Sequence, residues 1–162
     1  ARIDPGLAFG TGSHISTRLA LRFLEKNVRA GMRMLDYGCG SGILAIAAAM
    51  LGAGEIAAVD IDPQALDATA SNARRNAVAL QVCAPGSLAA GTYDLIVANI
   101  LAGPLVALAP VLAARTRQGA RIALSGILES QAADMLAAYA HDFSATVAAT
   151  DEGWALIEGR RR

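Results

Sequence analysis

The chain has 162 residues, of which 54% are apolar, and its 14 Lys and Arg balance its 14 Asp and Glu. This length suits one domain with a sizeable core, and the zero net charge excludes the basic footprint of a general nucleic-acid binder. Two cysteines and two histidines exclude a disulfide framework and a zinc-ligand pattern, and no apolar run is long enough to span a membrane. We therefore expect a cytoplasmic protein with reduced thiols and no metal.

Residues 4–14 are expected to form a loop, because they contain three glycines and a proline. Phe9 in this loop fits either a pinned surface loop or a lid over a ligand, and composition does not separate the two. A helix is predicted over 15–27, where apolar residues follow helical spacing. Ser16 and Thr17 lie in its first turn, where their hydroxyls would cap the helix or bind a ligand.

The stretch over residues 33–62 organises the chain: a short strand, a glycine turn, an apolar helix and a second strand that ends in acid. Gly38, Gly40 and Gly42 let the backbone bend sharply and approach a ligand where a Cβ would collide. The next helix directs its free N–H groups at this turn. Asp60 follows at a distance of about 20 residues, where an acidic residue meets a ribose diol. This pattern predicts a site for a nucleoside-containing cofactor.

The rest of the chain alternates strands and helices. Strands are predicted over 33–37, 55–60, 80–84, 93–98, 121–125, 143–149 and 154–158, and helices over 43–51, 63–76 with Asp62 as N-cap, 104–116 and 128–141. Gly119 is expected to end a helix, and Arg160–Arg162 are expected to be a solvated tail. Five strand–helix alternations followed by a hairpin imply an α/β fold with a doubly wound, mostly parallel sheet and an antiparallel edge.

Four candidate residues fall at carboxyl ends of the predicted strands. They are Gly38, Asp60, Ser87 and Asn99. Ligands of doubly wound sheets bind at these ends, where the strand order reverses. We therefore expect the four residues to converge on one crevice.

The identity of the cofactor depends on Asp36. Residues 40–45 match the glycine pattern of NAD-dependent dehydrogenases literally. However, Asp36 precedes the first glycine by two positions, and a carboxylate there would repel a pyrophosphate. S-adenosylmethionine carries an ammonium, a sulfonium and a ribose diol, so Asp36 favours it. A turn-stabilising or capping role for Asp36 remains the alternative, and Asp60 fits both cofactors.

Residues 36–42 resemble the first motif of class I S-adenosylmethionine-dependent methyltransferases, whose Rossmann-like, seven-stranded sheet ends in such a hairpin. More specifically, residues 4–12, 60–63, 98–105 and 124–128 are similar to the PrmA family, which methylates large-subunit ribosomal protein eleven. The similarity covers nearly the whole chain. It implies that residues 1–162 are the catalytic domain, and that the N-terminal substrate-recognition domain of the family is absent from this chain. The chain begins at Ala1 without Met, so we expect a fragment or a processed protein.

The resemblance also implies roles for individual residues. Phe9 and Thr11 would lie near the transferring methyl and the entering amine. As a mechanistic hypothesis apart from the resemblance, Asn99 would accept a hydrogen bond from that amine. Asp4 and His14 are candidate bases by proximity only, and loss of the proton to solvent is the alternative. The cofactor contacts implied or predicted are Thr17, Asp36, Gly38, Gly40, Gly42, Asp60, Ile61 on the adenine, Ser87 at the adenine edge, and Asn99.

The implied function is methyl transfer from S-adenosylmethionine to lysine and N-terminal amino groups of a ribosomal protein, without direct nucleic-acid or membrane contact. Two alternatives remain open: an NAD-dependent oxidoreductase, and a methyltransferase-like domain kept only for binding partners. The sequence indicates neither the oligomeric state nor the number of methyl groups added.

Overall fold

The structure, a computed structural model, describes residues 14–162. Its helices are α1 (Ile15–Asn27), α2 (Ile43–Met50), α3 (Pro63–Arg75), α4 (Ala102–Arg115) and α5 (Ala132–Tyr139), with 3₁₀ turns η1 (Pro85–Ser87) and η2 (Glu129–Gln131). Its strands are β1 (Arg33–Tyr37), β2 (Glu55–Val59), β3 (Gln81–Cys83), β4 (Tyr93–Asn99), β5 (Thr116–Leu128), β6 (Phe143–Asp151) and β7 (Trp154–Arg161).

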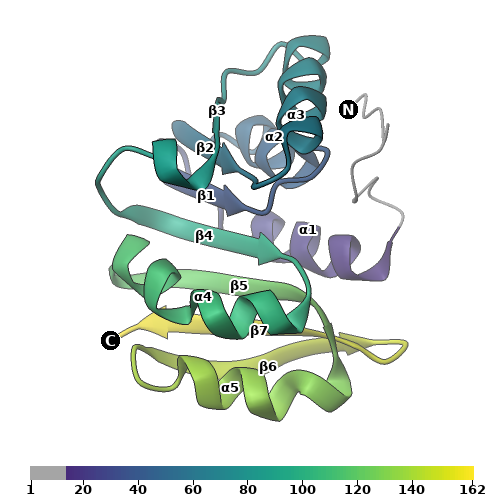
Figure 1. Cartoon of the computed structure of the whole chain (residues 1–162), viewed down its shortest axis with the longest axis vertical. Coiled ribbons are helices and arrows are strands. Elements are labelled where there is room, and N and C mark those ends of the chain that lie inside the picture. The colour runs from purple at the N-terminus through teal and green to yellow at the C-terminus, as the bar shows by residue number, and fades with distance from the viewer. Residues whose placement is uncertain (1–13) are drawn as a thin grey trace.

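The seven strands form one sheet in the order β3-β2-β1-β4-β5-β7-β6 (Figure 1). Strands β1 to β5 are mutually parallel, and β7 pairs antiparallel with both β5 and β6. The chain order reverses at β1, which lies between β2 and β4. The predicted α/β fold with a doubly wound, mostly parallel sheet and a C-terminal hairpin is therefore confirmed, and the reversal places a ligand crevice at the carboxyl end of β1.

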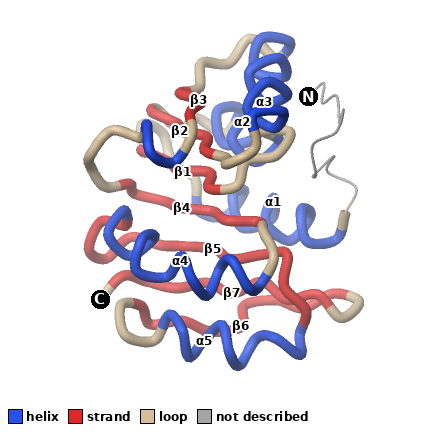
Figure 2. The backbone as a smooth tube through the Cα atoms, in the orientation of Figure 1, coloured by secondary structure: helices blue, strands red, loops and turns tan. Residues whose placement is uncertain are grey.

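Helices cover both faces of the sheet (Figure 2). Successive side chains of β1 divide between the two layers: Met34 packs in a core with α1 and α2, and Leu35 packs in a core with α4 and α5. Both side chains are fully buried. Because both faces are covered, the central strands read as nearly continuous apolar runs in the sequence.

Local signals set the starts of two helices. Asp62 caps α3 as predicted, since its carboxylate accepts a hydrogen bond from the Gln64 N–H at 2.9 Å. Helix α1 has its predicted bounds, but its cap is His14, whose Nδ1 accepts from the Ser16 N–H at 3.1 Å. The hydroxyl-capping prediction for Ser16 and Thr17 is therefore wrong, because the imidazole already occupies the capping position.

Most predicted boundaries differ from the structure by one or two residues, and the larger differences lie after α4. Helix α4 ends at Arg115 and β5 begins at once, so Gly119 does not end a helix. Gly119 instead has a φ of +80° in an irregular part of β5, where the register against β4 shifts between Tyr93 and Leu95. The helix predicted over 128–141 divides into η2 and the shorter α5, and β6 and β7 are longer than predicted.

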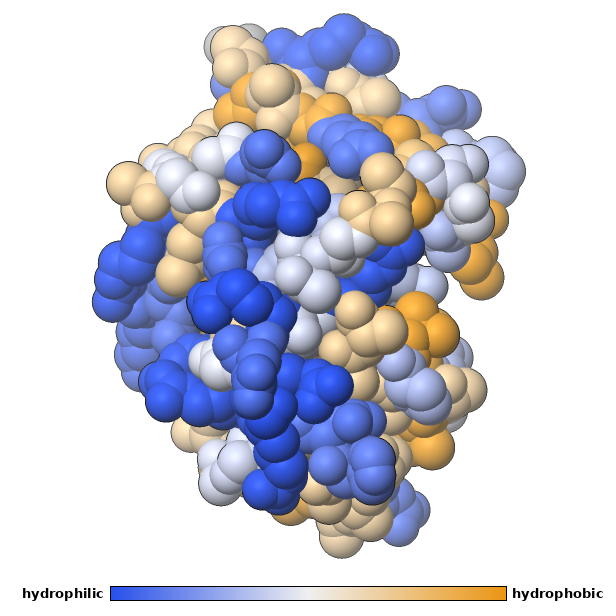
Figure 3. Space-filling view, turned by 90° about the vertical axis from the view of Figure 1, so that its left-hand side faces the viewer, coloured by the Kyte–Doolittle hydropathy of each residue, from blue (hydrophilic) through white to orange (hydrophobic). Residues whose placement is uncertain are grey.

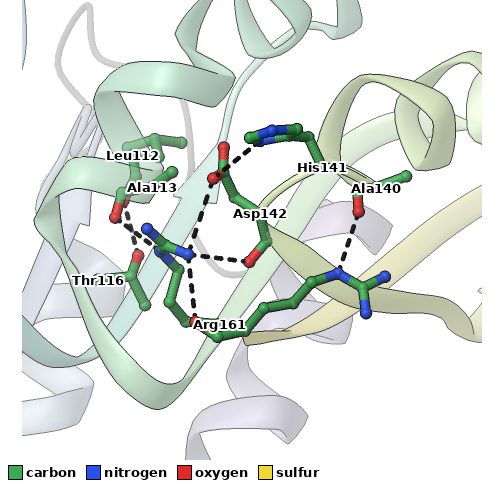
Figure 4. Close-up of polar contacts among 8 residues, drawn as sticks. Leu112, Ala113, Thr116, Ala140, His141, Asp142 and Arg161 are labelled. Carbon is green, nitrogen blue, oxygen red and sulfur yellow. Dashed lines mark hydrogen bonds and ion pairs between the residues drawn. The ribbon is translucent and has the colours of Figure 1, made fainter.

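The basic C-terminal residues are part of the fold, so the prediction of a solvated tail is wrong. Arg161 pairs with Phe143 across the β6–β7 ladder. Its guanidinium donates to the Ala113 and Asp142 carbonyl oxygens at 3.2 and 3.3 Å and lies 3.7 Å from the Asp142 carboxylate (Figure 4). Arg162 Nε donates to the Ala140 carbonyl oxygen at 3.1 Å.

Hydrophilic side chains gather across the face seen in Figure 3, which views the molecule from the side where the amino ends of β1 and β4 lie. Two ion pairs join neighbouring strands near these ends, Arg33 with Glu55 and Arg117 with Asp94, each at 2.8 Å. This polar face lies opposite the edge where the parallel strands end.

Candidate active site

A cavity of about 780 Å³ opens at the carboxyl ends of the strands. Its volume lies within the range of small-molecule and cofactor sites. It is lined by His14, Tyr37, Gly38, Cys39, Gly40, Ile43, Leu44, Asp60, Ile61, Asp62, Ala65, Asn99, Ile100, Leu101, Pro104, Ala107, Leu108, Gly126 and Trp154. Gly38, Asp60 and Asn99 therefore converge on one crevice as predicted.

The glycine turn after β1 is built by close contacts that exclude side chains. The Gly38 N–H donates to the Val59 carbonyl oxygen at 2.7 Å, which holds the turn against β2. A Cβ on Gly38 would lie 2.3 Å from Ile100 Cγ2, and one on Gly42 would lie 2.8 Å from Thr69 Cγ2. Both glycines also have positive φ values, so the alternating glycines are required by conformation and by space.

Asp60 lies in the cavity wall and is fixed by two backbone donors. Its Oδ2 accepts from the Gly40 N–H and its Oδ1 accepts from the Asp62 N–H, both at 3.0 Å. The next residue, Ile61, is 85% exposed and also lines the cavity. A fixed carboxylate beside an exposed aliphatic side chain suits a ribose diol next to a base.

Asp36 lies beneath the cavity instead of on its rim. Alternation along β1 places it on the same face as Met34, under α2, where it is 1% exposed. Its Oδ2 accepts from the Ala45 N–H at 3.1 Å, and its Oδ1 has no hydrogen-bond partner among residues 14–162. Burial raises the pKa of the carboxyl to about 7, against the hydrogen bond from Ala45, which lowers it.

The expectation that the Asp36 carboxylate lies where it would repel a pyrophosphate is therefore wrong, because the side chain is buried. Among the described residues, the acidic side chains that line the cavity are Asp60 and Asp62. No Lys or Arg stands among the described residues that line it. A contact of Asp36 with the cofactor stays a prediction.

Asn99 at the end of β4 is held by α1. Its Nδ2 donates to Thr17 Oγ1 at 3.2 Å, and its Oδ1 has no hydrogen-bond partner among the described residues. Gly126 packs on this oxygen, since a Cβ there would lie 2.9 Å from Asn99 Oδ1. Ser125 Oγ donates to the Ser16 carbonyl oxygen at 2.7 Å. The first turn of α1 is thereby tied to the carboxyl ends of β4 and β5.

Other predicted site residues lie differently. Thr17 is fully buried and does not line the cavity, so its link to the cavity is through Asn99. Ser87 is exposed at the end of η1 and is also absent from the lining. Phe9 and Thr11 lie outside the described residues.

Sequence reasoning missed an aromatic pair and an apolar wall. His14 and Trp154 both line the cavity, and their rings meet edge to face with centroids 4.8 Å apart. Leu101 lines the cavity from the loop after β4 and is 71% exposed. Leu101 lies two residues after Asn99, at the carboxyl end of a predicted strand, and this position could have predicted that it lines the cavity. The pairing of His14 with Trp154 has no such signal, because 140 residues of chain separate them.

Among residues 14–162, no group of three or more His, Cys, Asp or Glu could hold a metal ion. No helix in this part of the chain is long and apolar enough to cross a membrane.

Cys39 and Cys83 are both free thiols. Burial raises the pKa of Cys39 far above its ordinary value, so this thiol in the cavity wall stays protonated.

Comparisons with known proteins agree with this geometry. Over residues 1–162 the sequence matches the family described as ribosomal protein L11 methyltransferase (PrmA). A ribosomal protein L11 methyltransferase of Thiobacillus denitrificans is 56% identical over 161 residues, covering 99% of this chain and 54% of that protein. One of Cupriavidus metallidurans is 55% identical, covering 98% and 52%. The chain thus spans about half the length of these curated relatives.

Solved structures give the same result. The crystal structure of a ribosomal protein L11 methylase from Lactobacillus delbrueckii subsp. bulgaricus is 34% identical, with a TM-score of 0.89 and coverage of 99% of this chain and 84% of that one. A 16S rRNA methyltransferase from T. thermophilus in complex with AdoMet and guanosine has a TM-score of 0.81 over 96% of this chain and 45% of that one; at 20% identity it shows the shared fold. The family model matches the whole sequence, which includes the glycine turn, Asp60 and Asn99. This chain therefore belongs to the ribosomal protein L11 methyltransferase (PrmA) family.

Proposed function

We propose that this chain transfers methyl groups from S-adenosylmethionine to amino groups of ribosomal protein L11, on a lysine side chain and at the N-terminus. Its family membership supports the reaction. The structural observation that carries the proposal is the cavity wall, which contains Asp60 and Asp62 but, among its described residues, no Lys or Arg. Asp60 alone fits either cofactor, but Asp62 adds a second carboxylate and no described lining residue adds a cation, so the wall favours a ligand with a sulfonium and an ammonium over one with a pyrophosphate.

The residues fit this cofactor. The Asp60 carboxylate would accept hydrogen bonds from the ribose diol, and the exposed Ile61 would pack on the adenine. Gly38 and Gly40 line the cavity with backbone, and a side chain on Gly38 would collide with Ile100. The unpaired Oδ1 of Asp36 is a buried acceptor under the same turn. When bound, S-adenosylmethionine supplies a methyl group on an activated sulfonium.

Asn99 is the residue best placed to orient the incoming amine. Thr17 holds its amide group, so that Oδ1 is the acceptor left for an amine N–H. The amine must be neutral to attack, and a lysine with a reference pKa near 10.4 must lose a proton first. Positioning a neutral amine in line with the methyl supplies most of the catalysis in such a displacement.

His14 does not serve as the base in this arrangement. Its Nδ1 accepts from the Ser16 N–H, and a backbone N–H can only donate. The neutral ring therefore carries its proton on Nε2, which leaves no lone pair for the proton of the amine. We propose that this proton passes to solvent.

The two alternatives have less support. Dinucleotide-binding sheets commonly have the order 3-2-1-4-5-6, whereas here the antiparallel β7 lies between β5 and β6. A domain kept only for binding partners would not need the close-packed glycine turn, the fixed Asp60 and the held Asn99.

Transfer of a labelled methyl group from S-adenosylmethionine to purified L11 tests this function. The complete protein that contains this chain should label L11 at amino groups. Asn99→Ala should lower turnover at least 10-fold while cofactor affinity falls only partly. Undiminished turnover in Asn99→Ala would remove Asn99 from the reacting centre, and absence of any labelling by the unaltered protein would contradict the proposed function.

A further inference from the structure

Asp36 is a buried acid without the partners that a buried negative charge needs. Only 1% of the residue is exposed. Its Oδ2 accepts one hydrogen bond, from the Ala45 N–H, and its Oδ1 has no partner within residues 14–162. An ionised carboxyl in such a place is costly, because neither a cation nor a full set of donors replaces the lost water. The geometry therefore favours the protonated acid when the cavity above it is empty.

The elements packed around Asp36 supply no positive partner. Its neighbours in the sheet are Ala58 of β2 and Val97 of β4, and α2 carries no charged residue. The titratable or charged groups on the other elements at this end of the sheet are Cys39 in the glycine turn, Asp60 and Asp62 after β2, and His14 and Arg18 at the start of α1. Burial is the main cause of the raised Asp36 pKa, and the Asp60 charge adds to it, whereas no basic side chain of the described chain lowers it.

Although buried, Asp36 is within electrostatic reach of the cavity wall. Cys39 and Asp60 both line the cavity. After burial, the Asp36 charge is a further cause of the raised pKa of Cys39, and the Asp60 charge is a further cause of that of Asp36. The lining that the structure describes contains two carboxylates and no Lys or Arg. A cation bound in the cavity would therefore favour the ionised form of Asp36, and by linkage the ionised form would favour the cation.

We propose that binding of S-adenosylmethionine displaces the Asp36 proton to solvent, and that this exchange lets the site distinguish the cofactor from its demethylated product by charge. The inference rests on the proposed methyl transfer and adds a specificity-determining role for Asp36. When the C–S bond breaks, its electron pair stays on sulfur, so the sulfonium becomes a neutral thioether. The positive charge that stabilised the ionised carboxyl is then lost, Asp36 takes up a proton again, and the product is held less tightly than the cofactor.

This exchange makes cofactor affinity depend on pH. A bound sulfonium that lowers the Asp36 pKa from about 7 by about one unit would raise the affinity for S-adenosylmethionine about 6-fold between pH 5.5 and 7.5. Affinity for S-adenosylhomocysteine, which has the same amino and carboxyl groups but no sulfonium, should change less than about 2-fold. At pH 6.5, about half a proton should be released for each S-adenosylmethionine bound. Calorimetry in buffers of different ionisation enthalpy measures this number directly.

The test uses the complete protein that contains this chain and three variants of it. Asp36→Asn keeps the shape of the carboxyl and removes the ionisable proton. Asp67→Asn removes an exposed acid of α3 that is absent from the cavity wall, so it is the matched control for lost charge. His14→Asn removes the titratable ring from the cavity wall and keeps a side chain that caps helices. Affinities for both ligands and the thermal midpoint are measured for each protein.

Asp36→Asn should release no proton and should lose about 5-fold or more of the preference for S-adenosylmethionine over S-adenosylhomocysteine at pH 7.5. Asp67→Asn and His14→Asn should keep the proton release and the preference. Binding of S-adenosylmethionine to the unaltered protein without proton release would overturn the inference, and this result needs no variant. Proton release that persists in Asp36→Asn, or disappears in either control variant, would also overturn it. Failure of the unaltered protein to bind S-adenosylmethionine at all would instead refute the proposed function on which the inference rests.

Discussion

Asn99 donates its side-chain amide to Thr17 Oγ1 at 3.2 Å, and this contact joins the end of β4 to the first turn of α1 across 82 residues of chain. Both residues are buried. Thr17 does not line the cavity, so its effect on the reaction passes through the orientation of Asn99.

Thr17→Val keeps the shape of the side chain and removes the acceptor for Asn99 Nδ2. An unpaired buried amide costs about 1–3 kcal/mol, so Asn99 should turn away and turnover should fall about 10-fold or more. Thr17→Ser keeps the hydroxyl and should retain most of the activity. The comparison is made by methyl-transfer kinetics, and equal turnover in the Val and Ser variants would contradict the positioning role of Thr17.

Asp36 makes stability depend on pH. Its pKa is raised from 3.8 to about 7 by burial, so the folded state binds the proton more tightly than the unfolded chain. Stability from this group is therefore fully present below about pH 4 and falls as pH rises towards 7. Asp36→Asn resembles the protonated carboxyl, so it should be more stable than the unaltered protein at pH 8, by up to about 4 kcal/mol, and nearly equal to it at pH 4.

Urea unfolding of both proteins at the two pH values measures this difference, and a variant that is less stable at pH 8 would refute the raised pKa. Calorimetry on the same variant tests the predicted cofactor contact. If the buried carboxylate serves S-adenosylmethionine, Asp36→Asn should bind it at least 5-fold more weakly. Unchanged affinity would leave Asp36 without a part in the site.

Gly126 should tolerate no side chain. A Cβ there would lie 2.8 Å from the Ile100 carbonyl oxygen and 2.9 Å from Asn99 Oδ1, and its φ is +83°. Gly126→Ala should therefore destabilise the protein by about 2–4 kcal/mol. Gly119 is the matched control: its φ is +80°, with nothing within 4 Å of a Cβ, so Gly119→Ala should cost only about 1–2 kcal/mol. Equal losses in denaturant unfolding would exclude the contact with Asn99 as the cause.

The sequence predicted those features that local signals determine. Asp62 and Pro63 predicted the start of α3 because a helix cap acts within a few residues of itself. The glycines and Asp60 predicted the crevice because their spacing is a recognisable pattern, although the hydrogen bond from the Gly40 N–H to Asp60 spans 20 residues. The burial of Asp36 was not predictable, since a β residue next to a glycine turn becomes buried only when α2 packs over it. The start of β5 was misplaced for a similar reason: Gly119 has the conformation of a helix breaker, but β5 begins at Thr116, which pairs with β4 before this glycine.

Arg161 tests the corrected description of the C-terminus. Its guanidinium ties β7 to the Ala113 carbonyl oxygen and to Asp142. Arg161→Ala should lower the free energy of unfolding by about 1–2 kcal/mol, because it leaves partly buried acceptors unpaired. Arg160→Ala, at the exposed neighbouring position, should change it by less than about 0.5 kcal/mol. Both variants should bind cofactor normally, and equal stabilities would restore the solvated-tail interpretation.

The central claim is that the acidic wall of the cavity selects a sulfonium nucleoside over a dinucleotide. Titration calorimetry of the purified protein with S-adenosylmethionine and, separately, with NAD measures this selection most directly. The account predicts saturable binding of S-adenosylmethionine, weakened at least 10-fold in Asp60→Ala, and no measurable heat of binding with NAD. Saturable binding of NAD in place of S-adenosylmethionine would contradict it.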